Sequence, residues 1–145
     1  MIHYGMFVRW QQYRSQALNP HLRKHNDEHA CLKAILVESV RVNGKPRQRH
    51  VAFLGSLEID AITEAKSPLG SWYDDVMTTV RRRFWYDVTT VLERLSNRVD
   101  PEDRQRIADS IAKKVGGRLM TEAELKQFDR EIEAMFELPP RAGYK

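Results

Sequence analysis

The stretch Val37–Gly55, VESVRVNGKPRQRHVAFLG, decides the fold of the N-terminal part of this chain. Two runs that contain β-branched residues flank Asn43-Gly44, the dipeptide preferred in two-residue hairpin turns, where both residues take positive φ. These runs predict strands from about residue 31 to 42 and from 45 to 54. The turn also fixes which residues face each other across the two strands. The predicted pairs are Val42 with Lys45, Val40 with Arg47, Glu38 with Arg49, Leu36 with Val51 and Ala34 with Phe53.

The two ends of this hairpin differ in polarity. The pairs far from the turn are apolar and share one face, so they are expected in the core. Near the turn the same face is charged, which predicts a tip that projects into solvent. Pro46 lies opposite Arg41 in a non-hydrogen-bonded pair and has no N–H to offer another strand. The strand that begins at Lys45 is therefore predicted as an edge, with the strand 31–42 in the centre of the sheet.

Another strand is predicted before the hairpin, because Met6–Arg14 carries the aromatic and β-branched residues typical of strands. Residues 16–29 form a polar connection in which Asn19-Pro20 marks a turn. The three strands then follow one another in sequence order, as a small antiparallel meander.

Helical periodicity begins at about Leu57. A short helix is predicted over 58–65, and a long helix follows whose apolar residues recur at steps of four, three and four. Asp100-Pro101 begins the next helix and Gly116-Gly117 ends it. Thr121–Glu124 is a capping box that opens a last helix, which Pro139-Pro140 stops. The apolar positions of these three helices are Tyr73, Met77, Val80, Phe84, Val88, Val91 and Leu95; then Ile107, Ile111 and Val115; then Leu125, Phe128, Ile132 and Met135.

The predicted fold class is therefore α+β: a small three-stranded antiparallel meander followed by three to four helices, one of them long. A chain of 145 residues predicts a single domain. Within it, residues 1–57 form the meander with the basic hairpin, 58–138 form the helical part and 139–145 form a tail.

Charge is spread unevenly along the chain. Residues 1–57 hold nine Lys and Arg against three Asp and Glu, whereas residues 58–145 hold fifteen against seventeen. This asymmetry predicts an N-terminal part that meets phosphates and a C-terminal part that serves as scaffold or protein contact. The single cysteine excludes an internal disulfide, and neither a membrane-spanning apolar run nor a signal peptide is expected. These features predict a cytoplasmic protein without membrane association.

Basic residues concentrate in the hairpin, and a two-stranded ribbon is narrow enough to enter the major groove of DNA. The preceding strand adds cations for phosphates, and Trp10 and Tyr13 for stacking. The alternative is structural: Arg49 pairs with Glu38, and the other cations keep an exposed edge soluble. The candidate nucleic-acid-binding residues are Arg9, Arg14, Arg41, Lys45, Arg47, Arg49 and His50.

A second basic cluster, Arg81–Arg83, precedes Phe84-Trp85-Tyr86 on the long helix. It predicts a partner-binding surface with candidate residues Trp72, Arg82, Trp85 and Tyr86. The alternative is a helix face of solvated arginines, offset in part by Asp74, Asp75 and Asp87. The same helix also offers a route to a homodimer.

Sequence spacing gives little support for a metal or a catalytic centre. His21, His25, His29 and Cys31 are the only candidate ligands, and their intervals match no zinc signature, so no metal site is predicted. The sequence contains no Gly-rich phosphate loop, nucleophile elbow or His-Glu-x-x-His motif. We therefore expect neither an enzyme nor a cofactor.

The strand Met6–Arg14 and the hairpin together resemble the N-terminal segment of insertion-sequence transposases that have a DDE catalytic core. The resemblance depends on Val37-Glu38-Ser39, Arg41, Gly44-Lys45, Arg47-Gln48-Arg49 and Leu54-Gly55. This chain differs by about a dozen extra residues between its first two strands, and an RNase-H-like catalytic domain does not fit within it. The resemblance implies a DNA-end-binding type of module, and it does not carry transposase activity over to this chain.

Two functions follow as hypotheses. The first is a small non-enzymatic nucleic-acid-binding protein of a bacterial mobile element, which contacts DNA or RNA through the basic hairpin. The second is a phage- or plasmid-encoded inhibitor that binds a host nuclease or defence complex, as anti-CRISPR proteins do. Its partner would be a nucleic-acid-processing protein complex, with Trp72, Trp85 and Tyr86 as anchors.

Overall fold

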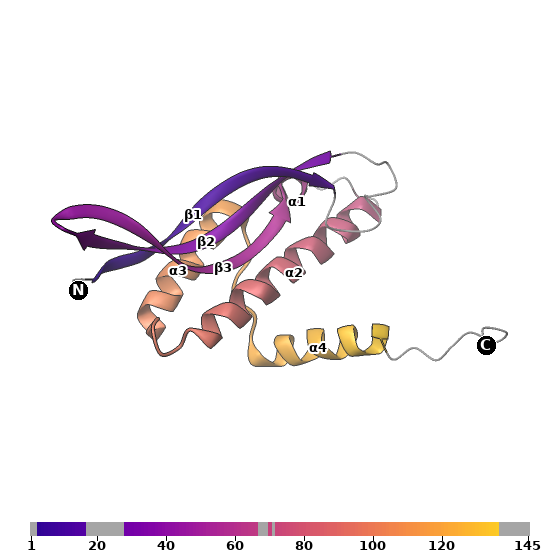
Figure 1. Cartoon of the computed structure of the whole chain (residues 1–145). Helices are drawn as coiled ribbons and strands as arrows, with labels where there is room; N and C mark the ends of the chain where they lie inside the picture. The colour runs from indigo at the N-terminus through magenta and orange to yellow at the C-terminus, as the bar shows by residue number, and fades with distance from the viewer. Residues whose placement is uncertain (1–2, 17–27, 67–69, 71, 137–145) are drawn as a thin grey trace.

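In the part of the chain that the structure describes, three strands come first and four helices follow (Figure 1). The computed structural model describes residues 3–16, 28–66, 70 and 72–136. The strands are β1 (His3–Gln16), β2 (Glu28–Val42) and β3 (Lys45–Glu58). The helices are α1 (Ile59–Lys66), α2 (Trp72–Arg94), α3 (Pro101–Val115) and α4 (Glu122–Phe136). The predicted α+β class is confirmed, and each strand is longer than its predicted range.

The strands form one antiparallel sheet in the order β1-β2-β3, so the predicted meander and the central position of β2 are confirmed. Asn43 and Gly44 have φ of 53° and 76°, as a type I′ turn requires. Figure 1 shows the hairpin end of the sheet projecting past the helices. All residues from Arg41 to His50 are exposed, which agrees with the predicted solvent-exposed tip.

The predicted register is correct near the turn and wrong near the base of the hairpin. Val42 pairs with Lys45, Arg41 with Pro46 and Glu38 with Arg49 as predicted. Beyond them, shifts between Leu36 and Val37 and between Ala34 and Ile35 each add one residue to β3. Leu36 therefore pairs with Ala52 rather than Val51, Ile35 pairs with Phe53, and Ala34 pairs with Gly55.

Each of these shifts is a β-bulge, in which two residues of one strand oppose one residue of its partner. The second bulge lets both Leu54 and Gly55 face the helices: Leu54 is in the core at 1% exposure, and a Cβ on Gly55 would lie 3.1 Å from the Phe84 ring. The bulges also turn Phe53 outward, where it is 50% exposed rather than buried as the simple alternation predicts.

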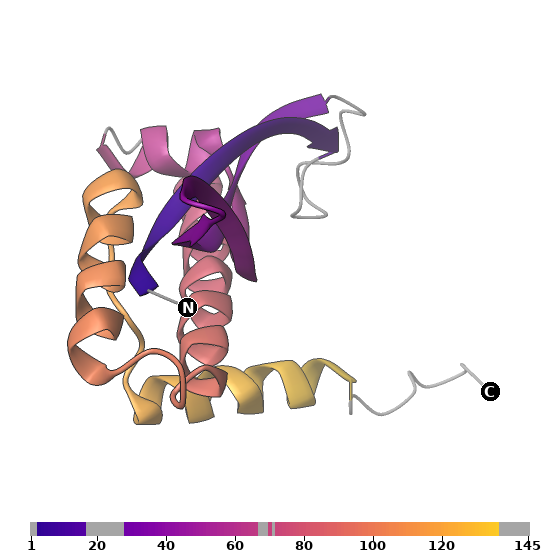
Figure 2. The ribbon, with the colours of Figure 1, turned by 60° about the vertical axis from the view of Figure 1, so that its left-hand side comes forward.

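The helix termini follow the predicted signals. The Asp100 side chain accepts a hydrogen bond from the Asp103 N–H at 2.8 Å and begins α3. At the start of α4, the Thr121 N–H donates to Glu124 at 2.9 Å and the Glu124 N–H donates to Thr121 at 3.2 Å, so the predicted capping box is confirmed. Figure 2 shows α4 at the end of the molecule opposite the sheet.

The core lies between the sheet and the helices α1, α2 and α3. Alternate residues of β1 and β2, among them Met6, Leu36 and Ala34, face this core. The predicted stripe of α2 supplies Met77, Phe84 and other buried residues. The side chains of Tyr73 and Met135, and the tail 139–145, lie outside the described part of the chain. Within that part, no helix is long and apolar enough to cross a membrane.

Candidate nucleic-acid interface

The tip of the hairpin, residues 41–50, presents cations on both of its faces. Lys45, Arg47 and Arg49 share the face that continues toward the helices, while Arg41 and His50 lie on the other. Arg41 donates to the Gly44 carbonyl at 2.9 Å, which ties it to the turn. Within the described part of the chain, Lys45 and Arg47 make no hydrogen bond or ion pair with other side chains. Within that part of the fold, the charges of Lys45 and Arg47 therefore have no role in holding the structure together.

The predicted pair of Glu38 and Arg49 is present and joins the tip to the core. Glu38 is only 2% exposed, and Arg49 forms an ion pair with it. Arg98, from the turn between α2 and α3, reaches the same carboxylate oxygen at 3.4 Å. A buried carboxylate is costly unless it is paired and hydrogen-bonded. Arg49 is therefore first a structural partner of Glu38, and its exposed part remains accessible to a ligand. Arg98 was not predicted, because the contact joins residues sixty positions apart in the sequence.

The predicted residues on β1 divide between the two faces of the sheet. Arg9 is exposed on the face away from the helices and donates to the Gln48 side chain at 3.3 Å. Arg14 is exposed near the other end of the strand, away from the tip. Trp10 faces the helices and stacks on Phe84 with ring centroids 6.3 Å apart, so its predicted stacking role is wrong. The structure thus brings Arg9 near the tip and separates Arg14 and Trp10 from it.

Tyr13 and Cys31 form a second, polar cluster on the face away from the helices. The Tyr13 hydroxyl and Ser56 Oγ are 2.7 Å apart, and Lys33 lies over the Tyr13 ring at 5.6 Å. Burial, followed by the nearby charge of Glu58, raises the pKa of the Cys31 thiol. Burial is also the main cause of the raised pKa of Tyr13. Both groups are therefore neutral at pH 7 and unsuited to act as a nucleophile or base.

The second predicted surface, on α2, is largely used inside the fold. Trp85 is 5% exposed, and its Nε1–H donates to the Gly116 carbonyl at 2.9 Å, so the prediction of a surface anchor is wrong. Tyr86 donates to Asp129 and its ring lies 4.5 Å from Phe128. Arg82 forms an ion pair with Glu131 at 3.1 Å. Arg82 and Tyr86 thus hold α4 against α2. The side chain of Trp72 lies outside the described part.

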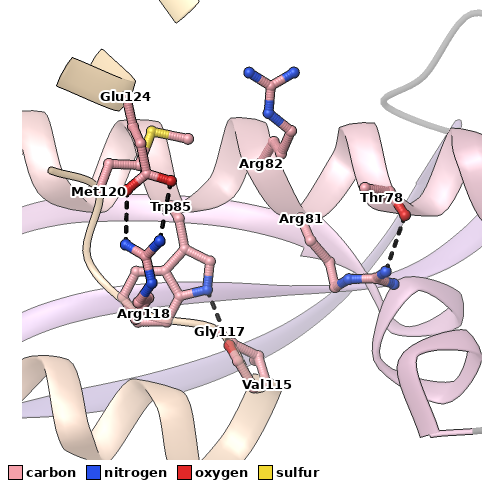
Figure 3. Close-up of a pocket in the computed structure, with 10 residues that line it drawn as sticks. Thr78, Arg81, Arg82, Trp85, Val115, Gly117, Arg118, Met120 and Glu124 are labelled. Carbon is pink, nitrogen blue, oxygen red and sulfur yellow. Dashed lines mark hydrogen bonds and ion pairs between the residues drawn. The ribbon is translucent and has the colours of Figure 1, made fainter.

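A pocket of about 270 Å³ lies between α2 and the connection from α3 to α4 (Figure 3). Its arginines already have partners: Arg118 donates twice to Glu124, at 2.7 and 3.1 Å, and Arg81 donates to the Ala61 carbonyl at 2.9 Å. The bonds from Arg118 and from the Thr121 backbone hold the pKa of Glu124 at about 2. These contacts make the pocket part of the scaffold rather than an anion site.

The candidate metal ligands cannot be assembled from the described residues. His21 and His25, and the side chain of His29, lie outside them, and Cys31 is fully buried. Among the described residues, no group of three or more His, Cys, Asp or Glu side chains is placed to hold a metal.

Comparison with known proteins locates a similarity in the same region. Residues 23–76 match the family model of the IS1634 family transposase N-terminal domain. The matched stretch includes all of β2, β3 and α1, and therefore the complete basic hairpin. No curated protein and no solved structure matches the chain. The resemblance predicted from the hairpin residues is thus confirmed: this part of the chain is similar to the N-terminal domain of a transposase.

Proposed function

We propose that this chain is a non-enzymatic nucleic-acid-binding protein of a bacterial mobile element and contacts DNA or RNA through the tip of the β2–β3 hairpin. The observation that carries the proposal is the pair Lys45 and Arg47. Both are exposed, both lie on a projecting edge, and folding uses neither side chain within the described residues. The similarity of residues 23–76 to a transposase domain supports the link to a mobile element.

The shape of the tip suits a polyanion. A two-stranded ribbon can enter the major groove or follow a phosphate backbone. Because cations lie on both faces of the ribbon, phosphates on either side of it can be neutralised. Each neutralised phosphate releases bound counterions, so the affinity is expected to fall steeply with salt, with a log–log slope of about −0.9 per phosphate on duplex DNA.

The test compares two double variants of equal charge. Lys45→Ala/Arg47→Ala removes the two cations of the tip. Lys113→Ala/Lys114→Ala removes two exposed cations from the last turn of α3, away from the hairpin. Fluorescence anisotropy with a labelled duplex of about 20 base pairs, at salt concentrations from about 50 to about 300 mM, measures affinity and its salt dependence.

The tip variant is expected to reduce the salt slope by about two and to weaken binding at every salt concentration. The α3 variant is expected to bind within about twofold of the parent, because its two lysines lie away from the proposed interface. Circular dichroism checks that both variants fold. If the folded tip variant binds like the parent, or if the two variants weaken binding equally, the proposed interface is wrong.

The rival function, an inhibitor of a host nuclease or defence complex, loses two of the three aromatic anchors that motivated it. Trp85 is buried and Tyr86 bonds to Asp129 in the same chain. The homodimer through α2 stays a prediction; it would have to use faces other than the apolar stripe, which already contacts the sheet.

A further inference from the structure

The sheet has a second face that no described helix covers. On this face Arg9, Ile35 and Phe53 form one row across the three strands, and Phe7, Val37 and His50 form the next. Ile35 and Val37 in the centre are 5% and 1% exposed, whereas Phe7 and Phe53 at the sides are 39% and 50% exposed. We call these six residues the open face. The accessible apolar surface of the open face comes from the two aromatic rings, since the aliphatic residues between them are buried.

The aromatic rings do not stabilise the core, since both stand on the side away from the helices. The bulge at Val51 turns Phe53 outward, and regular alternation from the turn would have turned it inward. Exposed apolar side chains gathered on one surface can mark an interaction site. Phe7 and Phe53 are therefore candidates for contact with a ligand.

The charge on this side identifies the class of ligand. Arg9 and His50 lie within the open face, and Lys33 and Arg41 lie on the same side of β2. Among the described strand residues that face this way, Glu58 is the only acid, and it is fully buried. A surface of aromatic rings and cations, without exposed carboxylates among these residues, is complementary to stacked bases on a phosphate backbone.

We propose that the open face binds unpaired nucleotides, with bases stacked on Phe7 and Phe53 and phosphates near Arg9 and His50. The two phenylalanines lie two strands and one row apart, so their Cα atoms are about 12 Å apart by standard strand spacing. One base cannot cover both rings, and the bound segment must contain at least two unpaired bases. This inference rests on the proposed function and deepens it: the tip holds phosphates, and the open face selects single strands.

The test uses the full chain with two labelled probes, a deoxythymidine strand of about 20 nucleotides and a duplex of the same length. A uridine strand of the same length separates DNA from RNA as the source of the bases. Phe7→Leu/Phe53→Leu removes the rings and keeps the apolar side chains, while Phe7→Tyr/Phe53→Tyr keeps the rings. Lys113→Ala/Lys114→Ala is the control, because these exposed side chains in the last turn of α3 belong neither to the tip nor to the open face.

The leucine variant is expected to lose at least about fivefold in single-strand affinity for each ring that stacks on a base. The duplex affinity of the leucine variant should stay within about twofold of the parent, and so should the single-strand affinities of the tyrosine variant and of the α3 variant. The inference is overturned if the folded leucine variant binds both single strands as the parent does, or if the parent binds the duplex alone; the proposed function survives either result. If the parent binds no nucleic acid, the inference and the proposed function both fail. If the leucine variant weakens the duplex equally, the open face does not select unpaired bases and the inference fails.

Discussion

The base and the tip of the β2–β3 hairpin are built by the same two strands and have opposite roles. At the base, Leu36 is fully buried and faces the helices. At the tip, every residue from Arg41 to His50 is exposed. The difference shows that a single strand pair can serve folding at one end and remain accessible to a ligand at the other. Glu38 and Arg49 mark the boundary, since the buried carboxylate binds the half-exposed guanidinium.

The largest expected effect lies at the base. Leu36→Ala should lower the free energy of unfolding by about 3 kcal/mol, because it removes buried methyl groups and leaves a cavity in a filled core. Urea denaturation followed by circular dichroism measures it. Val42→Ala at the exposed tip is the control and should cost less than about 1 kcal/mol. Equal losses in the two variants would remove the distinction between base and tip.

A substitution at the boundary between base and tip, where Arg49 binds Glu38, should have an intermediate effect on stability. Arg49→Ala leaves the buried Glu38 carboxylate with the longer contact to Arg98, at 3.4 Å, and should cost about 2 kcal/mol. The same denaturation experiment measures this loss. Arg83→Ala is a suitable control, because Arg83 is 65% exposed and its ion pair with Asp87 lies on the surface. A loss at Arg49 no larger than that at Arg83 would show that the buried carboxylate does not depend on its arginine.

A substitution in the turn should lower the free energy of unfolding by less than Arg49→Ala does. Gly44 has φ of 76°, a conformation that costs an L-residue about 1 kcal/mol. Gly44→Ala should therefore lower the free energy of unfolding by about that amount, without a steric clash, because no atom lies within 4 Å of the added Cβ. A Gly44→Asn variant, whose side chain tolerates positive φ, should recover part of the loss. If alanine and asparagine behave alike, backbone strain is not the cause.

The smallest effect on stability is expected for the cations of the tip. Lys45→Ala/Arg47→Ala should change the free energy of unfolding by no more than about 0.5 kcal/mol, since neither side chain has a partner within the described part of the chain. Differential scanning calorimetry measures the melting temperature, and nucleic-acid binding is measured on the same sample. A large loss of stability would mean that these cations support the fold and would weaken the case for a binding role.

Much of the fold could be predicted from local signals. The Asn43-Gly44 turn, the cap at Asp100 and the capping box Thr121–Glu124 each depend on residues that are close in sequence, and each is observed as predicted. The candidate interface was predicted less completely. The tip was recognised from its charge, whereas the exposure of Phe7 was missed. Strand alternation could have predicted it, because Phe7 lies between Met6 and Val8 and must face the opposite side of the sheet.

The sequence by itself determined the order of strands and helices, the turn and the basic tip, because these follow from backbone preferences and from the distribution of charge over short stretches. Only the tertiary structure decided the two bulges of β3, the packing of Trp10 on Phe84, the burial of Trp85 and the role of Arg98. Each depends on contacts between segments far apart in the chain. Gly55 lies against Phe84 of α2, and the bulged register that brings it there also turns Phe53 outward. Register near a turn is local, whereas register far from a turn is set by what the helices must cover.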